Sequence, residues 1–262
     1  MGDFQTIRFQ VSDGVATITL NQADRLNPLD AQTISEIFAA LDTTLASKSR
    51  VLVFRGAGRA FSSGAGLKDA NGDPALSGDL GQVLEDFFNP LLERLCALPI
   101  PIVSVVQGVA AGAGCSLALA SDFVIASSKA YFLMAFVNIG LVPDMGATWL
   151  LPRLIGVARA TEMMMLGGKI AAEQAAAWGL IHRAVPPEDL EEAASDLITR
   201  LGRGPTVAYG MLRTTLRAGL HAPLAEILAM ERRNQRTAGQ TSDSAEGIQA
   251  FLDKRPAAFI GA

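Results

Sequence analysis

The first part of the chain alternates hydrophobic and polar residues and then changes to a helical spacing. Residues 5–11 and 14–20 alternate apolar and polar side chains around a Ser-Asp-Gly turn, which is the pattern of a β-hairpin. Between residues 30 and 46 the apolar side chains recur at helical spacing, and Asp30 stands where an N-cap is expected. An apolar run at residues 51–54 then predicts a buried strand.

The same order of elements returns further along the chain. The pattern predicts a helix over 80–98, a buried strand over 102–106, a helix from about residue 113 and a strand over 123–126. Strands that alternate with helices pair in parallel through right-handed crossovers, so we expect an α/β core. Beyond residue 162 only residues 181–185 have a strand pattern, and the last third is expected to be helical.

Composition places the chain among folded, acidic proteins. The 262 residues are 50% hydrophobic and 18% charged, which suits one large domain or two small ones with a core that needs no disulfide. There are 26 acidic and 22 basic residues, the net charge is −4, and no dense cluster of Lys and Arg is present. Nucleic acid is therefore not an expected partner.

Cysteine usage and the N-terminus favour a cytoplasmic protein. Cys96 and Cys115 stand in apolar surroundings without the spacing of a disulfide framework or a zinc site. Residues 1–9 lack the basic and apolar regions of a secretory signal. The uncharged stretch 95–121 is long enough to span a bilayer, but prolines and glycines interrupt it. We expect this stretch in the protein core and no association with a membrane.

Two segments, residues 51–67 and 102–120, share a buried strand followed by a turn of small residues. Small residues let a ligand approach the backbone, and the first N–H groups of a helix point outward with the positive end of its dipole. Two such N–H groups that converge form an oxyanion hole, which stabilises negative charge on a carbonyl oxygen. Close packing of a helix on a strand explains the same composition equally well, so both interpretations stay open.

Glycine turns also occur in nucleotide-binding proteins, but the spacing here does not fit them. The GAG at residues 56–58 is followed by Phe61 where a dinucleotide fingerprint has its third glycine. The GGKI at residues 167–170 lacks the remaining features of a phosphate loop, and no G-x-S-x-G elbow is present. Nicotinamide chemistry and serine-hydrolase chemistry are therefore disfavoured.

Asp144 is the one carboxyl group between Lys129 and Arg153, and its neighbours on both sides are apolar. Apolar surroundings resist ionisation, so the pKa of this carboxyl should rise towards the range that suits a general base. Alternatively, Asp144 only caps a helix that starts near Met145. Its residues alone do not decide between these roles.

The other ionisable side chains are weaker candidates for catalysis. His182 and His221 lie in the last third of the chain, and Cys115 has no base close to it in the sequence. Asp122 directly precedes a predicted strand and is expected to hydrogen-bond backbone groups of the turn before it, which is a structural role.

Four stretches resemble the enoyl-CoA hydratase/isomerase, or crotonase, family. They are AFSSGAGLK at residues 60–68, VQGVAAGAGCSLALASDFVIAS at 106–127, IGLVPDMGATWLLPRLIG at 139–156 and AFLDKRPAAF at 250–259. The resemblance implies an α/β fold with a spiral of ββα units over residues 1–190 and a helical trimerisation region over 191–262. It also implies a CoA thioester as substrate, no separate cofactor and no metal, and a homotrimer or hexamer.

The resemblance also assigns roles by position. It gives the two oxyanion-hole N–H groups to Ala65 and Ala113. The substrate-binding positions that it implies are Arg25, Ala60, Ser63, Gly64, Leu67, Gly112, Ser116, Phe132, Phe136 and Lys254. Of these, Arg25 and Lys254 match basic positions near the CoA phosphates, and residues 60–67 match the adenine pocket. The usual aspartate after Ala65 is replaced by glycine, so one local hydrogen bond is missing.

Two departures from the family pattern bear on the reaction. Hydratases of the family carry glutamates where this sequence has Ser116 and Phe136, so water addition is expected to be poor. Phe136, together with Phe132, should instead wall an apolar acyl pocket. Asp144, in the setting PDMGATWLLPR, matches an aspartate of family isomerases similar to the epoxyphenylacetyl-CoA isomerase of phenylacetate catabolism.

The resemblance therefore implies an acyl-CoA isomerase of phenylacetate or fatty acid degradation. Ala65 and Ala113 would polarise the thioester while Asp144 removes a proton and returns it elsewhere, which shifts a double bond or rearranges a ring epoxide. An enoyl-CoA hydratase and an acyl-CoA-binding homologue without catalysis are the alternatives. An aromatic dehalogenase is disfavoured because residues 80–98 contain no histidine.

Overall fold

A six-stranded sheet forms the centre of the fold. The computed structural model describes residues 4–66 and 79–262, and within them this sheet has the strand order β1-β2-β4-β7-β9-β12. The strands are Ile7–Ser12, Val15–Leu20, Val51–Gly56, Ile102–Val106, Phe123–Ser127 and Arg183–Val185. β1 and β2 pair antiparallel as the expected hairpin, and all later neighbours pair in parallel. The predicted α/β core is therefore confirmed.

The helix α1 (Ala31–Ala46) begins where the sequence predicts it. Asp30 is its N-cap, and the Asp30 carboxylate accepts a hydrogen bond from the Thr33 backbone N–H at 2.9 Å. Apolar residues three or four positions apart share one face of a helix, and on this face Ile34 and Ile37 are fully buried. The sequence pattern therefore fixes both the start of α1 and the side that meets the sheet.

A second sheet lies beside the first, with the strand order β11-β10-β8-β5, and a short pairing joins β3 to β6. In chain order these strands are β3 Pro28–Leu29, β5 Ala60–Ser62, β6 Gly64–Ala65, β8 Val109–Ala111, β10 Tyr131–Leu133 and β11 Lys169–Ala171. β11 has no strand pattern in the sequence. Its middle residue, Ile170, is buried while both neighbours are exposed, and three residues are too few to show an alternation.

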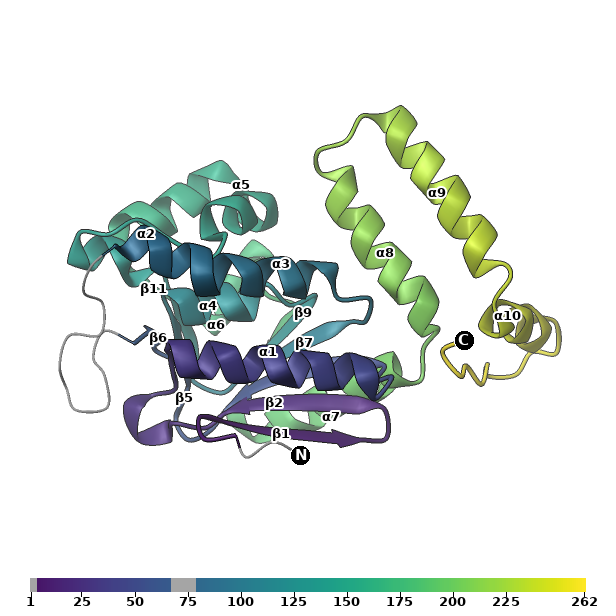
Figure 1. Ribbon diagram of the computed structural model, residues 1–262, viewed down its shortest axis with the longest axis horizontal. Helices are drawn as coiled ribbons and strands as arrows, with labels where there is room; N and C mark the ends of the chain where they lie inside the picture. Colours follow the sequence, from purple (N-terminus) through teal and green to yellow (C-terminus); the bar gives the residue numbers. More distant parts are fainter. Residues whose placement is uncertain (1–3, 67–78) are drawn as a thin grey trace.

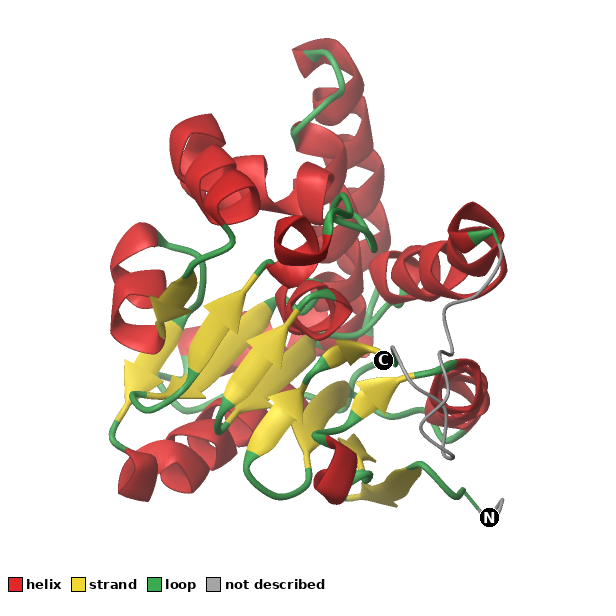
Figure 2. Cartoon of the chain, turned by 90° about the vertical axis from the view of Figure 1, so that its left-hand side faces the viewer, coloured by secondary structure: helices red, strands yellow, loops and turns green. Residues whose placement is uncertain are grey.

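Helices cover both faces of the larger sheet (Figures 1 and 2). They include α3 Asn89–Ala97, α4 Ala113–Leu119, α5 Ala147–Leu166, α6 Ala172–Trp178 and α7 Leu190–Gly202. Successive side chains of a strand point to opposite faces, so β4 contributes Leu52 and Phe54 to the core cluster with α1 and α4. Val51 and Val53 of the same strand belong to the cluster with α7.

The predicted helix over residues 80–98 is present with one irregular turn. α2 (Leu80–Val83) continues into a π-helical turn, η2 (Leu84–Phe88), which leads into α3. Single π turns inside helices occur frequently at functional sites. Here Leu84 and Phe88, the first and last residues of the turn, both line the cavity described below.

The uncharged stretch 95–121 lies in the protein core, as expected. It contains the end of α3, the strands β7 and β8 and the helix α4, whose residues are all buried. Among the described residues, none of the helices combines the length and the apolar character that crossing a bilayer requires.

Three helices at the C-terminal end project from the rest of the molecule (Figure 1). They are α8 (Thr206–Gly219), α9 (Leu224–Ala238) and α10 (Ser242–Leu252). α7, which begins at the expected domain boundary of residue 190, packs on the sheet. The projecting part therefore starts after α7, and the division into residues 1–190 and 191–262 stays a prediction.

Arg213 joins the projecting helix α8 to the core. It is 6% exposed, and its Nε donates a hydrogen bond to Asp122 Oδ2 at 2.6 Å. Its other nitrogens donate to two backbone carbonyls at the C-terminal end of α3. The Ile102 N–H donates to the same Asp122 oxygen at 2.8 Å, and Arg217 Nη2 lies 3.4 Å from Asp122 Oδ1. Asp122 therefore has a structural role, as expected, but the backbone N–H that it binds belongs to Ile102 at the start of β7 and not to the turn before Asp122.

Candidate active site

A cavity of about 330 Å³ opens between β6, the start of α4, the π-helical turn and the loop before α5. It is lined by Ser63, Ala65, Leu80, Gly81, Val83, Leu84, Phe88, Gly112, Ala113, Ala135, Phe136, Ile139, Leu141, Val142 and Asp144. Apart from the Ser63 hydroxyl and the Asp144 carboxyl, the side chains that line it are apolar. The cavity thus brings both small-residue turns and the predicted carboxyl to one place.

The two turns touch each other at positions that have no room for a side chain. Gly64 has a φ of +94°, and a Cβ on it would lie 2.6 Å from the Ala111 carbonyl oxygen. A Cβ on Gly114 would lie 2.5 Å from the Cβ of Ser62. Both distances are too short for a real Cβ, so the approach of the two backbones requires glycine. Close packing and a ligand site are therefore compatible interpretations of the same residues.

Ala65 is the last residue of β6 and Ala113 the first residue of α4, and both line the cavity. Ala113 is the first residue of α4, and the first N–H groups of a helix have no partner within it. Directly after β6, the Gly66 N–H donates to the Leu29 carbonyl of β3 at 3.4 Å. Because neighbouring N–H groups of a strand point to opposite sides, the Ala65 N–H points away from β3. This geometry supports the predicted oxyanion hole.

Asp144 lies in the same cavity. Burial raises the pKa of its carboxyl from 3.8 to about 6, against a smaller lowering effect of a hydrogen bond with its own backbone N–H. The Oδ1 atom is buried and has no hydrogen-bond partner among the residues that the structure describes. A carboxyl group with this pKa can accept and release a proton near neutral pH.

Asp144 does not cap the helix that follows it. α5 begins at Ala147, and its N-cap is Gly146, without a side-chain hydrogen bond. Met145 and Gly146 both have left-handed backbone angles, with φ of 46° and 70°, which separate Asp144 from the helix by a sharp turn. The capping interpretation was wrong because the sequence does not reveal these two left-handed residues.

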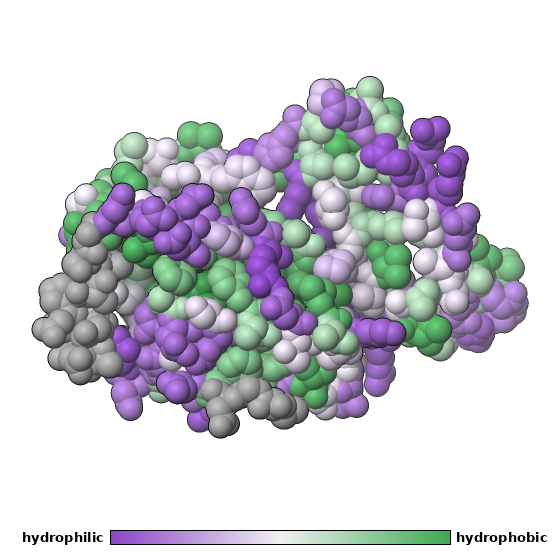
Figure 3. Space-filling view, viewed as in Figure 1, coloured by the Kyte–Doolittle hydropathy of each residue, from purple (hydrophilic) through white to green (hydrophobic). Residues whose placement is uncertain are grey.

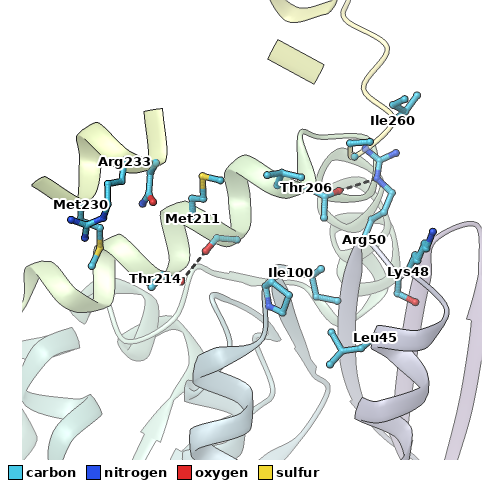
Figure 4. A pocket seen from close by; sticks show the side chains of 17 residues that line it. Leu45, Lys48, Arg50, Ile100, Thr206, Met211, Thr214, Met230, Arg233 and Ile260 are labelled. Atoms are coloured by element: carbon cyan, nitrogen blue, oxygen red, sulfur yellow. Dashed lines mark hydrogen bonds between the residues drawn. The ribbon is translucent and has the colours of Figure 1, made fainter. Parts of the chain in front are cut away.

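A larger groove, of about 790 Å³, lies between the core and the helices α8 and α9. Figure 4 shows it from close by, with Met211 of α8 and Met230 of α9 on one side. Its central cation, Arg50, is already engaged, because it donates to the Thr206 hydroxyl at 3.0 Å and to the carbonyls of Gly204 and Phe259. The described residues of this groove include no aspartate or glutamate side chain that could act as a base.

The weaker candidates have structural surroundings. Burial raises the pKa of the Cys115 thiol to about 12, so the thiol stays protonated at neutral pH and the reactive thiolate does not form. The His182 ring packs edge-on against Phe123, and the exposed His221 ring lies beside Arg153. In the described part of the chain no three His, Cys, Asp or Glu side chains are placed to hold a metal ion.

Residues 10–262 match the protein family described as enoyl-CoA hydratase/isomerase. The chain belongs to this family. It is 45% identical, over 98% of its length and 99% of the relative, to a probable enoyl-CoA hydratase of Rhodobacter capsulatus. It is 43% identical to the 1,2-epoxyphenylacetyl-CoA isomerase of Escherichia coli K12, over 96% of this chain and 97% of that one.

Solved structures of the enoyl-CoA hydratase/isomerase family have the same fold. The enoyl-CoA hydratase/isomerase of Cupriavidus metallidurans CH34 superposes with a TM-score of 0.90 at 31% identity and covers 100% of this chain and 98% of that one. The crotonase-like fold that the sequence resemblance implied is therefore confirmed.

Only some of the substrate-binding residues that the family resemblance predicts line the cavity. Besides Ala65, Ala113 and Asp144, the cavity is lined by Ser63, Gly112 and Phe136. Gly64 supports it from behind through its contact with Ala111. Leu67 lies outside the described residues.

Three other predicted residues are buried behind the cavity and do not line it. Phe132 is fully buried in β10, because its side chain points into the core between the sheets. The Ala60 carbonyl accepts hydrogen bonds from the side-chain amides of Asn27 and Gln107, which hold the turn from the core side. Ser116 is fully buried, and its hydroxyl donates to the Asp144 backbone carbonyl at 3.3 Å.

The two basic positions are separated within one chain. Arg25 lies at the end of a short 3₁₀ turn, 3.6 Å from the Asp30 carboxylate, and its carbonyl lies 3.5 Å from the Ser63 hydroxyl. Lys254 follows α10, at the opposite end of the long axis from α2 and β6 (Figure 1). A single chain therefore does not bring Lys254 to the cavity.

Several residues that line the site had no signal as site residues in the sequence. Leu84 and Phe88 fit the apolar spacing of a core helix, and Ile139, Leu141 and Val142 lie on an irregular segment. Apolar side chains that line a cavity and those that fill a core have the same chemistry, so only their positions in the fold distinguish them.

Proposed function

We propose that this protein isomerises an acyl-CoA thioester by moving a proton between carbons of the acyl group. The observation that carries the proposal is Asp144. Among the described residues that line the apolar cavity it has the only carboxyl group, and its buried oxygen has no hydrogen-bond partner among them. A buried polar atom without a partner costs free energy, and its place in the same cavity as the Ala65 and Ala113 backbone favours a catalytic use.

The proposed reaction needs only groups of this chain and the thioester. The N–H groups of Ala65 and Ala113 bind the thioester oxygen. The Asp144 carboxylate takes a proton from the acyl chain, the C–H bond breaks, and its electron pair moves into an enolate whose negative charge lies on that oxygen. The protonated Asp144 then gives the proton to another carbon, which reforms the thioester carbonyl and leaves the double bond displaced.

The cavity wall supports an aromatic or cyclic acyl group. Phe88 and Phe136 line it together with leucine, isoleucine and valine side chains, and Phe136 is 8% exposed. Aromatic walls bind flat apolar groups well and exclude bulk water. The Escherichia coli relative is named for the isomerisation of 1,2-epoxyphenylacetyl-CoA, so a ring-epoxide rearrangement belongs to the same proposal.

An enoyl-CoA hydratase is the second candidate, because the Rhodobacter capsulatus relative carries that name. Hydration needs a water molecule held and activated beside the β-carbon. At the two positions where the family resemblance places glutamates for this task, Phe136 presents a ring to the cavity and Ser116 does not line it. Asp144 alone would have to hold the water, deprotonate it and protonate the product, which favours slow hydration at most.

A non-catalytic acyl-CoA-binding protein is the third candidate. It would be favoured if Asp144 served only the helix after it. The helix α5 has a glycine N-cap, and Asp144 lines the cavity instead. These two observations favour catalysis over binding alone.

We also propose a cytoplasmic homotrimer or hexamer that uses no cofactor besides the CoA of its substrate. Several leucines of the projecting helices are exposed, namely Leu212 and Leu216 on α8, Leu220 directly after it, and Leu224 and Leu228 on α9. Hydrophobic residues are also visible in the hollow between the core and these helices (Figure 3). Exposed apolar side chains that gather on neighbouring helices are typical of subunit contacts.

A screen of acyl-CoA esters, analysed by mass spectrometry, tests the proposal. The panel contains crotonyl-CoA, enoyl-CoA esters with the double bond at other positions, and esters with cyclic acyl groups. Isomerisation leaves the mass of the ester unchanged and alters its fragments and absorbance, whereas hydration adds one water. We expect isomerised products; a hydrated product as the main outcome would favour the second candidate, and tight binding without turnover the third.

A further inference from the structure

Ser116 connects the two halves of the proposed catalytic site. It lies on α4, three residues after Ala113, which corresponds to about 4.5 Å along the helix axis. Serine hydroxyls inside helices commonly bond to a carbonyl of the preceding turn. The Ser116 hydroxyl instead donates to the backbone carbonyl of Asp144 at 3.3 Å. The helix that offers the oxyanion donor thus also holds the segment that carries the base.

The segment around Asp144 makes few hydrogen bonds to the rest of the fold, although the neighbouring Met145 is buried in the core. Residues 141–146 belong to no helix or strand, and Met145 and Gly146 have left-handed backbone angles. Within the segment, the Ala147 N–H donates to the Asp144 carbonyl at 3.0 Å. Among the described residues, Ser116 makes the only hydrogen bond to Asp144 from a distant part of the chain. The backbone is therefore held while the carboxyl stays free to exchange a proton.

We propose that Ser116 is a positioning residue, which ties the Asp144 backbone to α4 and so fixes the carboxyl relative to the Ala113 N–H. This inference rests on the proposed isomerase function. Misplacement of a reacting group by about 1 Å can lower a rate by about a hundredfold, so a single tether at this point matters. The family resemblance matches Ser116 to a glutamate that holds water in hydratases. In this protein the short, buried Ser116 side chain would position the base Asp144 instead.

The surroundings of Asp144 make its protonation a usable readout. Asp144 has the only ionisable side chain among the described residues that line the cavity. Glu85 and Asp86 on the adjacent π-helical turn are exposed and face away from the cavity, and Arg153 on α5 bonds to the exposed His221. A change in the position of Asp144 therefore changes its hydration more than its contact with any charge.

The test compares Ser116→Ala and Ser116→Thr with Ser104→Ala as the matched control. Ser104 is also fully buried, but it lies on β7 and bonds to Ser121 away from the cavity. Two quantities are measured on the full-length protein. One is the kcat and KM for the best ester of the screen, and the other is the carboxyl titration of Asp144 by carbon-13 NMR, assigned with Asp144→Asn.

We expect Ser116→Ala to lower kcat roughly ten- to a hundredfold with KM changed less than about threefold, because binding groups stay in place. The Asp144 titration should move from about 6 towards the ordinary value of 3.8, because a loosened segment admits water. Ser116→Thr retains the hydroxyl and should restore most of both properties. Ser104→Ala should leave both at the wild-type level.

Two results would contradict the proposal that Ser116 positions Asp144. One is a Ser116→Ala protein with wild-type kcat or a wild-type Asp144 titration, and the other is a Ser104→Ala protein that reproduces both changes. The titration needs no turnover. A wild-type protein that isomerises no ester would therefore contradict the proposed function, while the titration alone would still decide whether Ser116 holds Asp144.

Discussion

Asp122 and Asp144 are two partly buried aspartates with opposite surroundings. Both oxygens of Asp122 are used, by the guanidinium groups of Arg213 and Arg217 and by the Ile102 N–H. In Asp144 the buried Oδ1 has no partner among the described residues, and the neighbours are apolar. The first carboxylate joins a projecting helix to the sheet, and the second faces a cavity.

The difference in hydrogen bonding separates a structural carboxyl from one that can exchange a proton near neutral pH. The Asp122 carboxylate accepts hydrogen bonds on both oxygens, which suits a structural role. An unpartnered carboxyl in an apolar cavity is poorly solvated as an anion, and burial accordingly raises the pKa of Asp144 to about 6. The two sites thus differ both in hydrogen bonding and in burial.

The largest effect is expected for Asp144→Asn, which keeps the shape and removes the base. Turnover should fall about a hundred- to ten-thousandfold while binding of the acyl-CoA ester stays nearly unchanged. Steady-state kinetics and calorimetric titration of the ester measure the two. Folded Asp122→Asn protein should keep its turnover, and comparable losses in both variants would remove the distinction between the carboxyls.

Arg213→Ala tests the structural role of the Asp122 site. It leaves Asp122 and two backbone carbonyls without their buried partner, so the free energy of unfolding should fall by about 3–5 kcal/mol. Arg217→Ala is the control, because its contact with Asp122 is longer and more exposed, and it should cost at most about 1 kcal/mol. Urea denaturation at one protein concentration measures both. Equal losses of unfolding free energy in the two variants would contradict the conclusion that Arg213 is the residue that joins α8 to the core.

Ala113→Pro removes one proposed oxyanion donor without a change of charge. Proline is tolerated at the first position of a helix, and Ala113 occupies that position in α4. We expect kcat/KM to fall about a hundred- to a thousandfold. Ser242→Pro, at the first position of α10, is the matched control and should leave kcat/KM unchanged. A small effect in both would show that the Ala113 N–H does not contact the thioester oxygen.

The smallest effect concerns stability against pH. A raised pKa in the folded chain means that protonated Asp144 is tolerated well and that its ionisation destabilises the fold as pH rises from about 4 through 6. Asparagine carries no charge, so Asp144→Asn should be more stable than the wild type at pH 8, by at most about 3 kcal/mol, with the difference reduced to about 0.6 kcal/mol or less at pH 4.

Thermal unfolding at the two pH values measures this difference. Asp196→Asn on the exposed face of α7 is the control and should change stability at neither pH. Equal stability of Asp144→Asn and the wild type at pH 8 would show that the carboxyl is better solvated than its place in the cavity indicates.

Much of the fold follows from local patterns. The hairpin, the start of α1 at its Asp30 cap, the strand Ile102–Val106 and the start of α4 at Ala113 all agree with the sequence analysis. Each depends on a pattern within a few residues, namely side-chain alternation, a short apolar run, a cap or a glycine turn. β11 was missed because its pairing with β10 depends on a partner far away in the sequence.

The candidate site was predictable in its chemistry and less so in its geometry. Apolar neighbours in the sequence predicted the raised pKa of Asp144, and the family resemblance located Ala65, Ala113 and Phe136. The resemblance did not separate Phe136, which lines the cavity, from Phe132, which fills the core. Whether a ring lines a cavity depends on which segments pack against it.

The sequence by itself determined which groups are available: small residues that expose backbone N–H groups, one isolated carboxyl and apolar side chains around it. The tertiary structure alone decided which of them meet. Gly64 and Gly114 allow two distant turns to touch, and two left-handed residues turn Asp144 away from its helix. These contacts join segments far apart in the chain, so their geometry is set by packing between elements and cannot be derived from local sequence preferences.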